Sequence, residues 1–324
     1  MAGDSTATAI EETERGYLYR RHSLPVRVMH WVNVAALLAL LMSGLQIFNA
    51  HPALYWGKSS YSGRPPVLDL HSEMRDDGSA VGVTEVLGHK FHTTGVLGLS
   101  RGPDGALTER GFPSWITLPG PQWLAMARRW HFFFAWLFVI NGAAYVGYSL
   151  WSRHLSRDLA PTRRDWRSIG RSIVDHLKFR HPHGDAAKDY NVLQKLAYLT
   201  VIFVLLPFIV LMGLAMSPRM DSFWPGWVDL VGGRQSARTL HFLAALGIVV
   251  FVLIHVFEVV ITGLWNNLRS MITGRYEIAV PRAPEPALAV PAAAPGAAPA
   301  PHAMPPATSE SAQPAERQNE GTQA

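Results

Sequence analysis

The stretch ARTLHFLAALGIVVFVLIHVFEVV, residues 237–260, sets two histidines, His241 and His255, into a run that is otherwise apolar. They are fourteen residues apart, which in a helix comes within about 40° of whole turns and gives a rise of about 21 Å. The two imidazoles therefore share one helix face at two depths. Ionisable side chains are costly inside a bilayer, so their presence in such a run indicates a function.

The composition indicates an integral membrane protein. Of the 324 residues, 48% are hydrophobic and only 16% are charged. Apolar residues gather in four runs, at 26–48, 130–151, 196–216 and 240–265. Each run is near or above the roughly 20 residues that a helix needs to cross the hydrocarbon layer. We therefore predict an all-α fold, a four-helix membrane bundle within residues 23–280 that follows a polar N-terminal arm at 1–22.

Charge predicts the orientation of the bundle. The segment 151–192, between the second and third runs, holds nine Lys or Arg against five Asp, and more arginines occur in the N-terminal arm and after the fourth run. Basic residues are enriched in cytoplasmic loops, so both termini are expected to be cytoplasmic. The net charge of +5 then reflects membrane topology. Nucleic-acid binding is disfavoured because no stacking aromatic pattern accompanies the basic residues.

Two segments outside the bundle carry weaker signals. The loop 49–129 is expected on the periplasmic side, and a Pro-Asp-Gly turn within it predicts a small hairpin. His89 and His92 form an H-x-x-H in this loop, a spacing that can bind metal, although ordinary loop histidines are the favoured interpretation. The segment 281–324 is rich in Ala and Pro, a composition typical of a disordered cytoplasmic tail.

The chain contains no cysteine, which excludes disulfides, Cys-ligated iron–sulfur clusters and covalently attached c-type haem. Two further histidines begin apolar runs at matching depths, His131 level with His241 and His30 level with His255. Each pair can supply both axial nitrogens of one iron. Because imidazole suits iron, we predict two haem b groups. His22 is an alternative to His30, but it lies outside the apolar run.

An arginine stands three residues before each of His30, His131 and His241. The three arginines are Arg27, Arg128 and Arg238. The spacing sets each on the face of its histidine, about one turn nearer the membrane surface. Arginine pairs with carboxylates in a fork geometry, so we predict that the three bind haem propionates. A topology signal is the plainer interpretation of any one of them.

Glu258 and Asn33 each lie three residues beyond a histidine, His255 and His30 respectively. Glu258 is a candidate proton donor or acceptor beside a quinone, because quinone chemistry moves protons together with electrons. The alternative is an ion pair near the helix end. Asn33 is a candidate hydrogen-bond partner for a quinone carbonyl.

Three stretches resemble the bacterial cytochrome b561-like family, which includes the b-type cytochrome subunits of nickel–iron hydrogenases, formate dehydrogenase and thiosulfate reductase. They are RHSLPVRVMHWVNVAALLALLMSGLQIF in the first run, RRWHFFFAWLFVINGAAY in the second, and the His-x13-His of the fourth. The similarity covers roughly residues 20–275. It implies a bacterial inner-membrane protein whose four helices hold two b haems, one by His30 with His255 and one by His131 with His241.

The resemblance also implies electron transfer between the quinone pool and a partner enzyme. Small members of the family act alone, and the long loop 49–129 departs from them. We therefore expect a periplasmic redox partner, such as a molybdopterin oxidoreductase or a c-type cytochrome. The alternative is a stand-alone oxidoreductase acting on a small diffusible substrate such as superoxide. A haem-free anchor or ion transporter is a third class.

Overall fold

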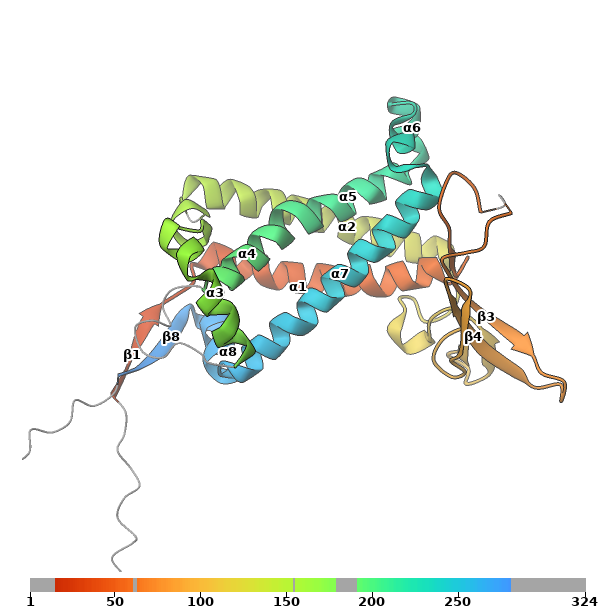
Figure 1. Cartoon of the computed structure of the whole chain (residues 1–324), viewed down its shortest axis with the longest axis horizontal. Helices are drawn as coiled ribbons and strands as arrows, with labels where there is room; N and C mark the ends of the chain where they lie inside the picture. The colour runs from red at the N-terminus through yellow and green to blue at the C-terminus, as the bar shows by residue number, and fades with distance from the viewer. Residues whose placement is uncertain (1–14, 61–62, 154, 179–190, 281–324) are drawn as a thin grey trace, which may run out of the picture. The chain divides into compact units, whose positions relative to one another are not determined.

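A computed structural model describes residues 15–60, 63–153, 155–178 and 191–280 of the protein. Its helices include four that are long and apolar enough to cross a membrane, as the sequence predicts. They are α1 (Leu24–Phe48), α2 (Leu124–Trp151), the composite span Val192–Ala215 and α7 (Arg234–Ile261) (Figure 1). The segment 281–324, predicted to be a disordered tail, lies outside the described residues.

The spans begin earlier in the chain than their apolar runs do. α2 starts at Leu124 rather than at residue 130, and α7 starts at Arg234 rather than at residue 240. The added turns carry polar residues, which a helix can place beyond the hydrocarbon core in the headgroup layer. Hydropathy alone therefore underestimates the helix lengths.

The third span is interrupted near Pro207. It consists of α4 (Val192–Thr200), a π-helical turn at Val201–Leu205 and α5 (Leu206–Ala215). Proline has no backbone N–H, and its ring crowds the carbonyl four residues earlier. That carbonyl belongs to Phe203, inside the π-helical turn, so the change in hydrogen-bond register occurs where proline disturbs the ladder.

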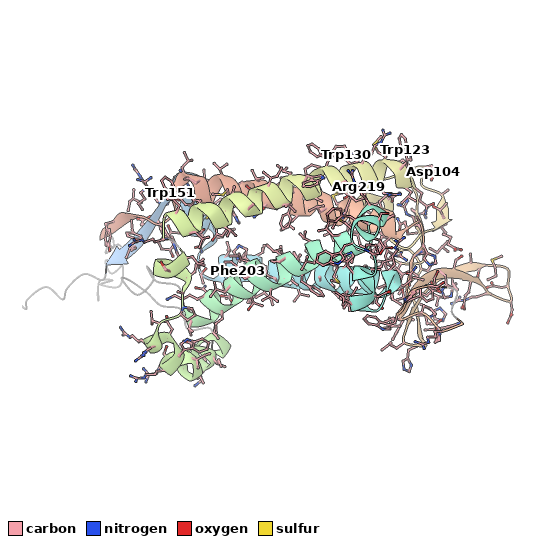
Figure 2. The ribbon with its side chains drawn as sticks, turned by 90° about the horizontal axis from the view of Figure 1, so that it is seen from above. Asp104, Trp123, Trp130, Trp151, Phe203 and Arg219 are labelled. Carbon is pink, nitrogen blue, oxygen red and sulfur yellow. The ribbon has the colours of Figure 1, made fainter. Side chains whose placement is uncertain are left out.

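The spans pack as two pairs. α1 lies along α2, and α5 lies along α7; Figure 2 shows the pairs as two layers, with the α1 and α2 ribbons together in one and the α5 and α7 ribbons in the other. Within the first pair, Asn141 Nδ2 donates to Asn33 Oδ1 at 2.7 Å and to the Met29 carbonyl at 2.9 Å. An amide bridge between helices satisfies polar groups that lipid cannot.

Strands make the all-α prediction incomplete. The loop 49–129 contains an antiparallel sheet in the order β2-β3-β4-β5 and a hairpin of β6 and β7, the latter at the predicted Pro-Asp-Gly turn. Their bounds are β2 (Ala53–Leu54), β3 (Leu68–Met74), β4 (Ala80–Val86), β5 (His89–His92), β6 (Leu99–Arg101) and β7 (Leu107–Glu109). Part of the N-terminal arm is also a strand, β1 (Arg15–Arg20), which pairs antiparallel with β8 (Arg275–Val280).

The loop 49–129 shares a core with the spans. Leu70 and Leu54 are buried against Phe48 at the end of α1, and Phe242 of α7 packs on the same cluster. Polar contacts fasten the segment 51–57 to the first turns of α7, where Thr239 Oγ1 donates to the Tyr55 carbonyl at 2.7 Å. The β-sheet is therefore held against the end of α7.

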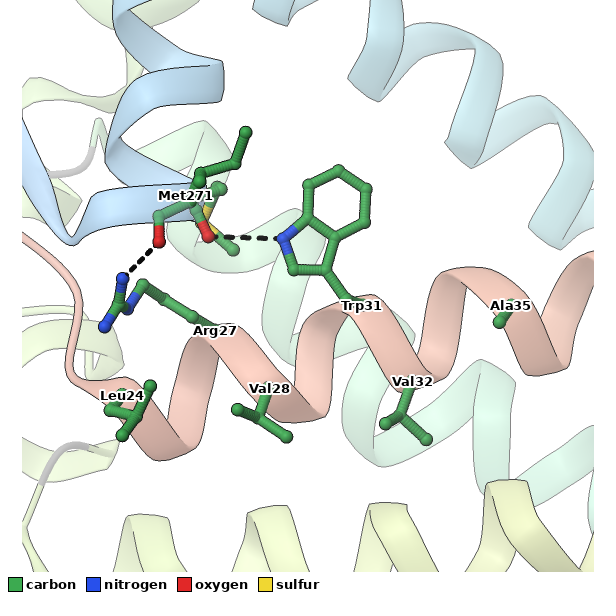
Figure 3. A pocket seen from close by; sticks show the side chains of 8 residues that line it. Leu24, Arg27, Val28, Trp31, Val32, Ala35 and Met271 are labelled. Carbon is green, nitrogen blue, oxygen red and sulfur yellow. Dashed lines mark hydrogen bonds between the residues drawn. The ribbon is translucent and has the colours of Figure 1, made fainter.

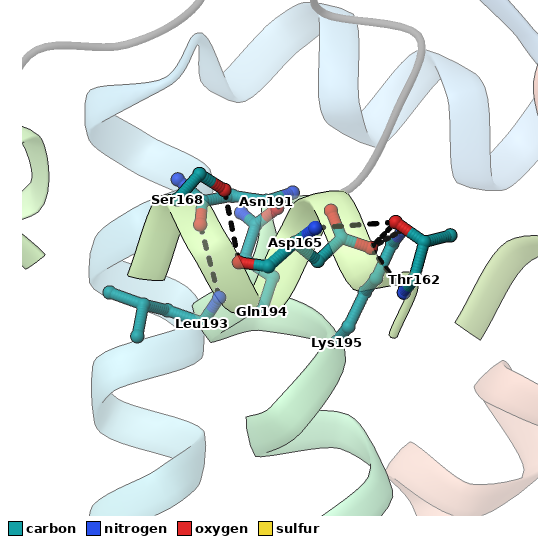
Figure 4. Close-up of polar contacts among 7 residues, drawn as sticks. All are labelled: Thr162, Asp165, Ser168, Asn191, Leu193, Gln194 and Lys195. Carbon is teal, nitrogen blue, oxygen red and sulfur yellow. Dashed lines mark hydrogen bonds and ion pairs between the residues drawn. The ribbon is translucent and has the colours of Figure 1, made fainter. Parts of the chain in front are cut away.

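Short helices connect the spans. They are the π-helical turn Leu155–Leu159, α3 (Arg163–Leu177), α6 (Pro218–Phe223), the 3-10 turns Ser114–Ile116 and Trp227–Val231, and α8 (Leu264–Thr273). α3 is fixed to α4 by Asp165, whose carboxylate accepts from the Thr162 N–H at 2.8 Å and from Lys195 Nζ at 3.0 Å (Figure 4). The Thr162 N–H is the largest cause that lowers the pKa of Asp165.

Arg110 is expected to hold the loop 49–129 together. Its side chain is 2% exposed and donates to the Phe112 carbonyl at 2.7 Å and to Thr117 Oγ1 and the Gly120 carbonyl at 3.1 Å each. Arg110→Ala would leave buried acceptors unpaired, at a cost on the order of 2 kcal/mol or more. Limited proteolysis should then cut this loop faster, whereas Arg101→Ala, at an exposed arginine whose guanidinium donates to the Gly105 carbonyl at 2.8 Å, should not. Equal cleavage of the two variants would contradict the assignment.

Candidate functional site

Two pairs of imidazoles connect α7 with the α1–α2 pair. The ring centres of His30 and His255 are 6.4 Å apart, and those of His131 and His241 are 6.2 Å apart. His241 and His255 stand on one helix, so the two pairs are separated along it by a rise of about 21 Å. The structure thus brings together the same histidines that the sequence pairs.

The ring separations suit one metal ion per pair. A metal–imidazole bond is about 2.0 Å, so a shared ion would set the ligating nitrogens about 4 Å apart and the ring centres about 6 Å apart. Both observed separations, 6.4 and 6.2 Å, have that value. Among the described residues, no cluster of three or more His, Cys, Asp or Glu could hold a metal ion; an iron porphyrin needs at most two axial ligands from the protein.

Hydrogen bonds fix the ring orientation of the second pair. His241 Nδ1 lies 2.9 Å from the Ile209 carbonyl of α5; a carbonyl only accepts, so Nδ1 carries the proton and Nε2 keeps its lone pair. His131 Nδ1 lies 3.2 Å from Ser43 Oγ, whose hydroxyl donates to the Ala39 carbonyl at 2.6 Å. Outer partners of this kind are typical of metal-binding histidines.

Two glycines make room for these rings. A Cβ on Gly44 of α1 would lie 3.4 Å from His131 Cε1, and a Cβ on Gly213 of α5 would lie 3.3 Å from His241 Cε1. A larger side chain at either position would press on an imidazole. Neither glycine nor the Ser43 and Ile209 contacts were identified from sequence. Ser43 carries a usable signal as a hydroxyl within an apolar run, whereas the Ile209 contact is made by its backbone and carries none.

The first pair lies among aromatic side chains. The Phe251 ring stacks on His255 with ring centres 6.0 Å apart and planes 14° apart. Trp31 lies edge-on to His30 with ring centres 5.4 Å apart. This end is therefore apolar around the imidazoles.

The arginines predicted to bind propionates have other contacts in the structure. Arg27 donates to the Ile272 carbonyl near the end of α8, and Arg238 donates to the carbonyls of Ala53, at 3.0 Å, and His51. Arg128 is exposed, with its guanidinium carbon 5.8 Å from the Phe132 ring centre. Their contact with a propionate stays a prediction.

His51 lies near Arg238, in the first turns of α7, and feels its charge. Burial is the main cause that lowers the pKa of His51, nearby Arg238 lowers it further, and Asp69 opposes the shift. A lowered pKa makes the His51 imidazole neutral near pH 7. The segment fastened to α7 therefore adds no histidine charge beside Arg238.

The remaining predicted residues are placed as follows. Glu258 is half-buried on α7, one turn beyond His255, and Asn33 accepts the hydrogen bond from Asn141 between α1 and α2; their quinone roles stay predictions. His22, the alternative to His30, lies before α1 and next to Gly274, the residue that follows α8. A Cβ on Gly274 would stand 2.8 Å from the His22 carbonyl oxygen. His89 and His92 are the first and last residues of β5, and both are exposed.

An apolar groove opens along the first turns of α1, and His30 is not among the residues that line it. It has a volume of about 490 Å³ and is lined mainly by α1 and by the end of α8 (Figure 3). Trp31, Val28 and Leu24 line it from α1, and Trp31 Nε1 donates to the Met271 carbonyl at 3.2 Å. Arg27 reaches across the same groove toward α8, as Figure 3 shows.

Comparison with known sequences identifies the family. Residues 21–274 match the family described as prokaryotic cytochrome b561. The chain belongs to this family. Its members are membrane cytochromes that bind b-type haem, and the two imidazole pairs of this b561 cytochrome have ring separations that suit such a group.

Two curated relatives are similar over different lengths. The putative protein-methionine-sulfoxide reductase subunit YedZ1 of Azospira oryzae is 28% identical over 257 residues, which cover 79% of this chain and 98% of the relative. The probable Ni/Fe-hydrogenase B-type cytochrome subunit of Cupriavidus necator is 28% identical over 158 residues, which cover 44% of this chain and 64% of the relative.

Gly213→Val should disturb haem binding at the second pair. The added methyl groups would meet the His241 ring, because a Cβ alone already stands 3.3 Å from it, and such overpacking displaces the ring. The b-type absorbance of the purified protein should fall, and Gly142→Val in α2, where a Cβ meets nothing within 4 Å, should leave it unchanged. An unaltered spectrum for Gly213→Val would show that the ring is not constrained there.

Proposed function

We propose that this cytochrome holds two b haems and carries electrons across the bilayer between a quinone and a periplasmic redox subunit. The observation that supports it best is the pair of imidazole sites at opposite ends of α7, with ring separations of 6.4 and 6.2 Å. The hydrocarbon core is about 30 Å thick. Two haem sites about 21 Å apart along one span would let an electron cross the hydrocarbon core in shorter transfers.

The chain's own side chains hold and orient the cofactors in this proposal. His30 with His255 would hold one haem, and His131 with His241 the other; each haem, when bound, would take up and release one electron at a time. The Ile209 carbonyl keeps the Nδ1 proton on His241, so that its Nε2 faces the iron. The apolar spans exclude water from both sites.

Quinone is proposed to bind in the groove along the first turns of α1, the part of the helix that also carries His30. The lining of Leu24, Val28 and Trp31 suits an apolar ring and tail, and Arg27 supplies N–H groups at its polar edge. Glu258, one turn beyond His255, is the proposed proton acceptor, because quinol oxidation releases protons. Asn33 is a second candidate, through its Nδ2, for donating to a quinone carbonyl; it does not line the groove, and its Oδ1 accepts from Asn141.

The partner is proposed to dock on the loop 49–129. A relative that this chain covers over 98% of its length is described as a subunit of a putative protein-methionine-sulfoxide reductase, which favours a periplasmic reductase as partner. Electrons would then flow from quinol to the partner. A molybdopterin oxidoreductase or a c-type cytochrome fits the same position. A stand-alone enzyme for a diffusible oxidant is the alternative, favoured if the isolated chain is fully active.

Single histidine variants test the two sites separately. The wild-type chain should contain two haems, and His131→Ala or His30→Ala should each contain one, because one imidazole cannot hold the iron from both faces. Haem per chain is measured on the purified protein, with the exposed His89→Ala as the control that keeps two. Two haems in His131→Ala would remove the proposed pairing.

The same variants also test where the quinone binds. In His131→Ala, added quinol should still reduce the remaining haem, whereas in His30→Ala it should not, because the haem nearest the groove is lost. Equal reduction of the two variants by quinol would place the quinone site elsewhere.

A further inference from the structure

α3 presents three chemically different faces. Arg163, Arg167 and Arg171 recur every four residues and therefore form one row along the helix. A neighbouring row carries two exposed apolar side chains, Trp166 at 54% and Ile173 at 45% accessible, whereas Val174, 46% accessible, projects within the arginine row. The third face is half-buried against the bundle and consists of Asp165, Ser168, Ile169 and Ser172.

The position of α3 is set by the spans around it. It lies in the connection between the end of α2 and the start of α4, and its first turn is tied to the first turn of α4 by the pair of Asp165 and Lys195 at 3.0 Å. The side chains of this pair are only 20% and 10% exposed. Because α4 opens a membrane span, its first turn lies at the depth of lipid headgroups, and α3 starts there too.

The arginine row has no protein partner in the described part of the chain. Among the described side chains, none of Arg163, Arg167 and Arg171 makes an ion pair, and Asp165 on the same helix is bound by Lys195. A free row of guanidinium groups beside an exposed Trp and Ile is the pattern of a helix that lies in the membrane surface.

We propose that α3 lies in the headgroup layer and that Arg163, Arg167 and Arg171 bind the phosphates of anionic phospholipids. Trp166 and Ile173 enter the acyl boundary, and the adjoining arginines reach the phosphates above it. An acidic soluble protein would pair with the arginines, but it would leave the apolar row exposed to water. The lipid satisfies both rows at once, and this inference does not depend on haem or quinone binding.

The depth of the helix can be measured because the chain has no cysteine. A nitroxide on Ile173→Cys, in nanodiscs containing anionic phosphatidylglycerol, should collide more with oxygen than with a water-soluble nickel chelate. The same label on Arg164→Cys, on the far side of the arginine row, should collide more with the chelate. Water access at position 173 equal to that at position 164 would overturn the proposal. That result would also favour a soluble protein, rather than lipid, as the ligand of the arginine row.

Lipid retention tests the arginine row itself. In the haem-loaded protein, Arg163→Gln, Arg167→Gln and Arg171→Gln together should lower phosphatidylglycerol affinity by about five-fold for each arginine removed, as counted by native mass spectrometry. The control removes the same charge from exposed Arg64, Arg75 and Arg219. Both proteins should keep the wild-type haem content, which shows that they are folded. Equal loss of lipid in the two triple variants would contradict a site on α3.

Discussion

The structure depends on two imidazole pairs that meet between two layers of helices. α1 packs on α2, and α5 packs on α7. α7 faces the α1–α2 layer through His255 at one end, opposite His30, and through His241 at the other end, opposite His131. Within lipid there is little hydrophobic force between helices, so polar contacts and close packing must hold them together. Ligation of a cofactor by both layers would therefore stabilise the bundle as well as equip it for redox chemistry.

The loop 49–129 contacts α7 beside His241, one of the two histidines of the His131–His241 pair. Arg238, one turn before His241, donates to backbone carbonyls of the loop, and Phe242 packs into the core that the loop shares with α1. Residues on either side of the histidine thus fix the sheet to the helix that would carry an axial ligand. A partner bound to the loop would be held at a fixed position relative to that site.

Helix geometry explains what could be predicted from sequence. A constant rise and rotation per residue turn the spacing of His241 and His255 into a depth and a face, and this reasoning paired the same histidines that the structure brings together. Helix ends were less predictable because polar first turns continue a span beyond its apolar run, as at Arg234. The β-sheet was missed although β3 and β4 are seven residues each and the alternation of Leu68, Asp69 and Leu70 is a usable strand signal. The Ile209 contact was inaccessible because every residue has the same carbonyl.

The most direct test of the central claim is a potentiometric titration of the b-type absorbance of the purified chain. The two imidazole pairs have different surroundings, aromatic around His30 and His255 and hydrogen-bonded around His131 and His241, so the potentials of haems held there should differ. The account predicts two one-electron steps of similar amplitude. A single one-electron step, or no b-type signal when haem and iron are supplied, would contradict it.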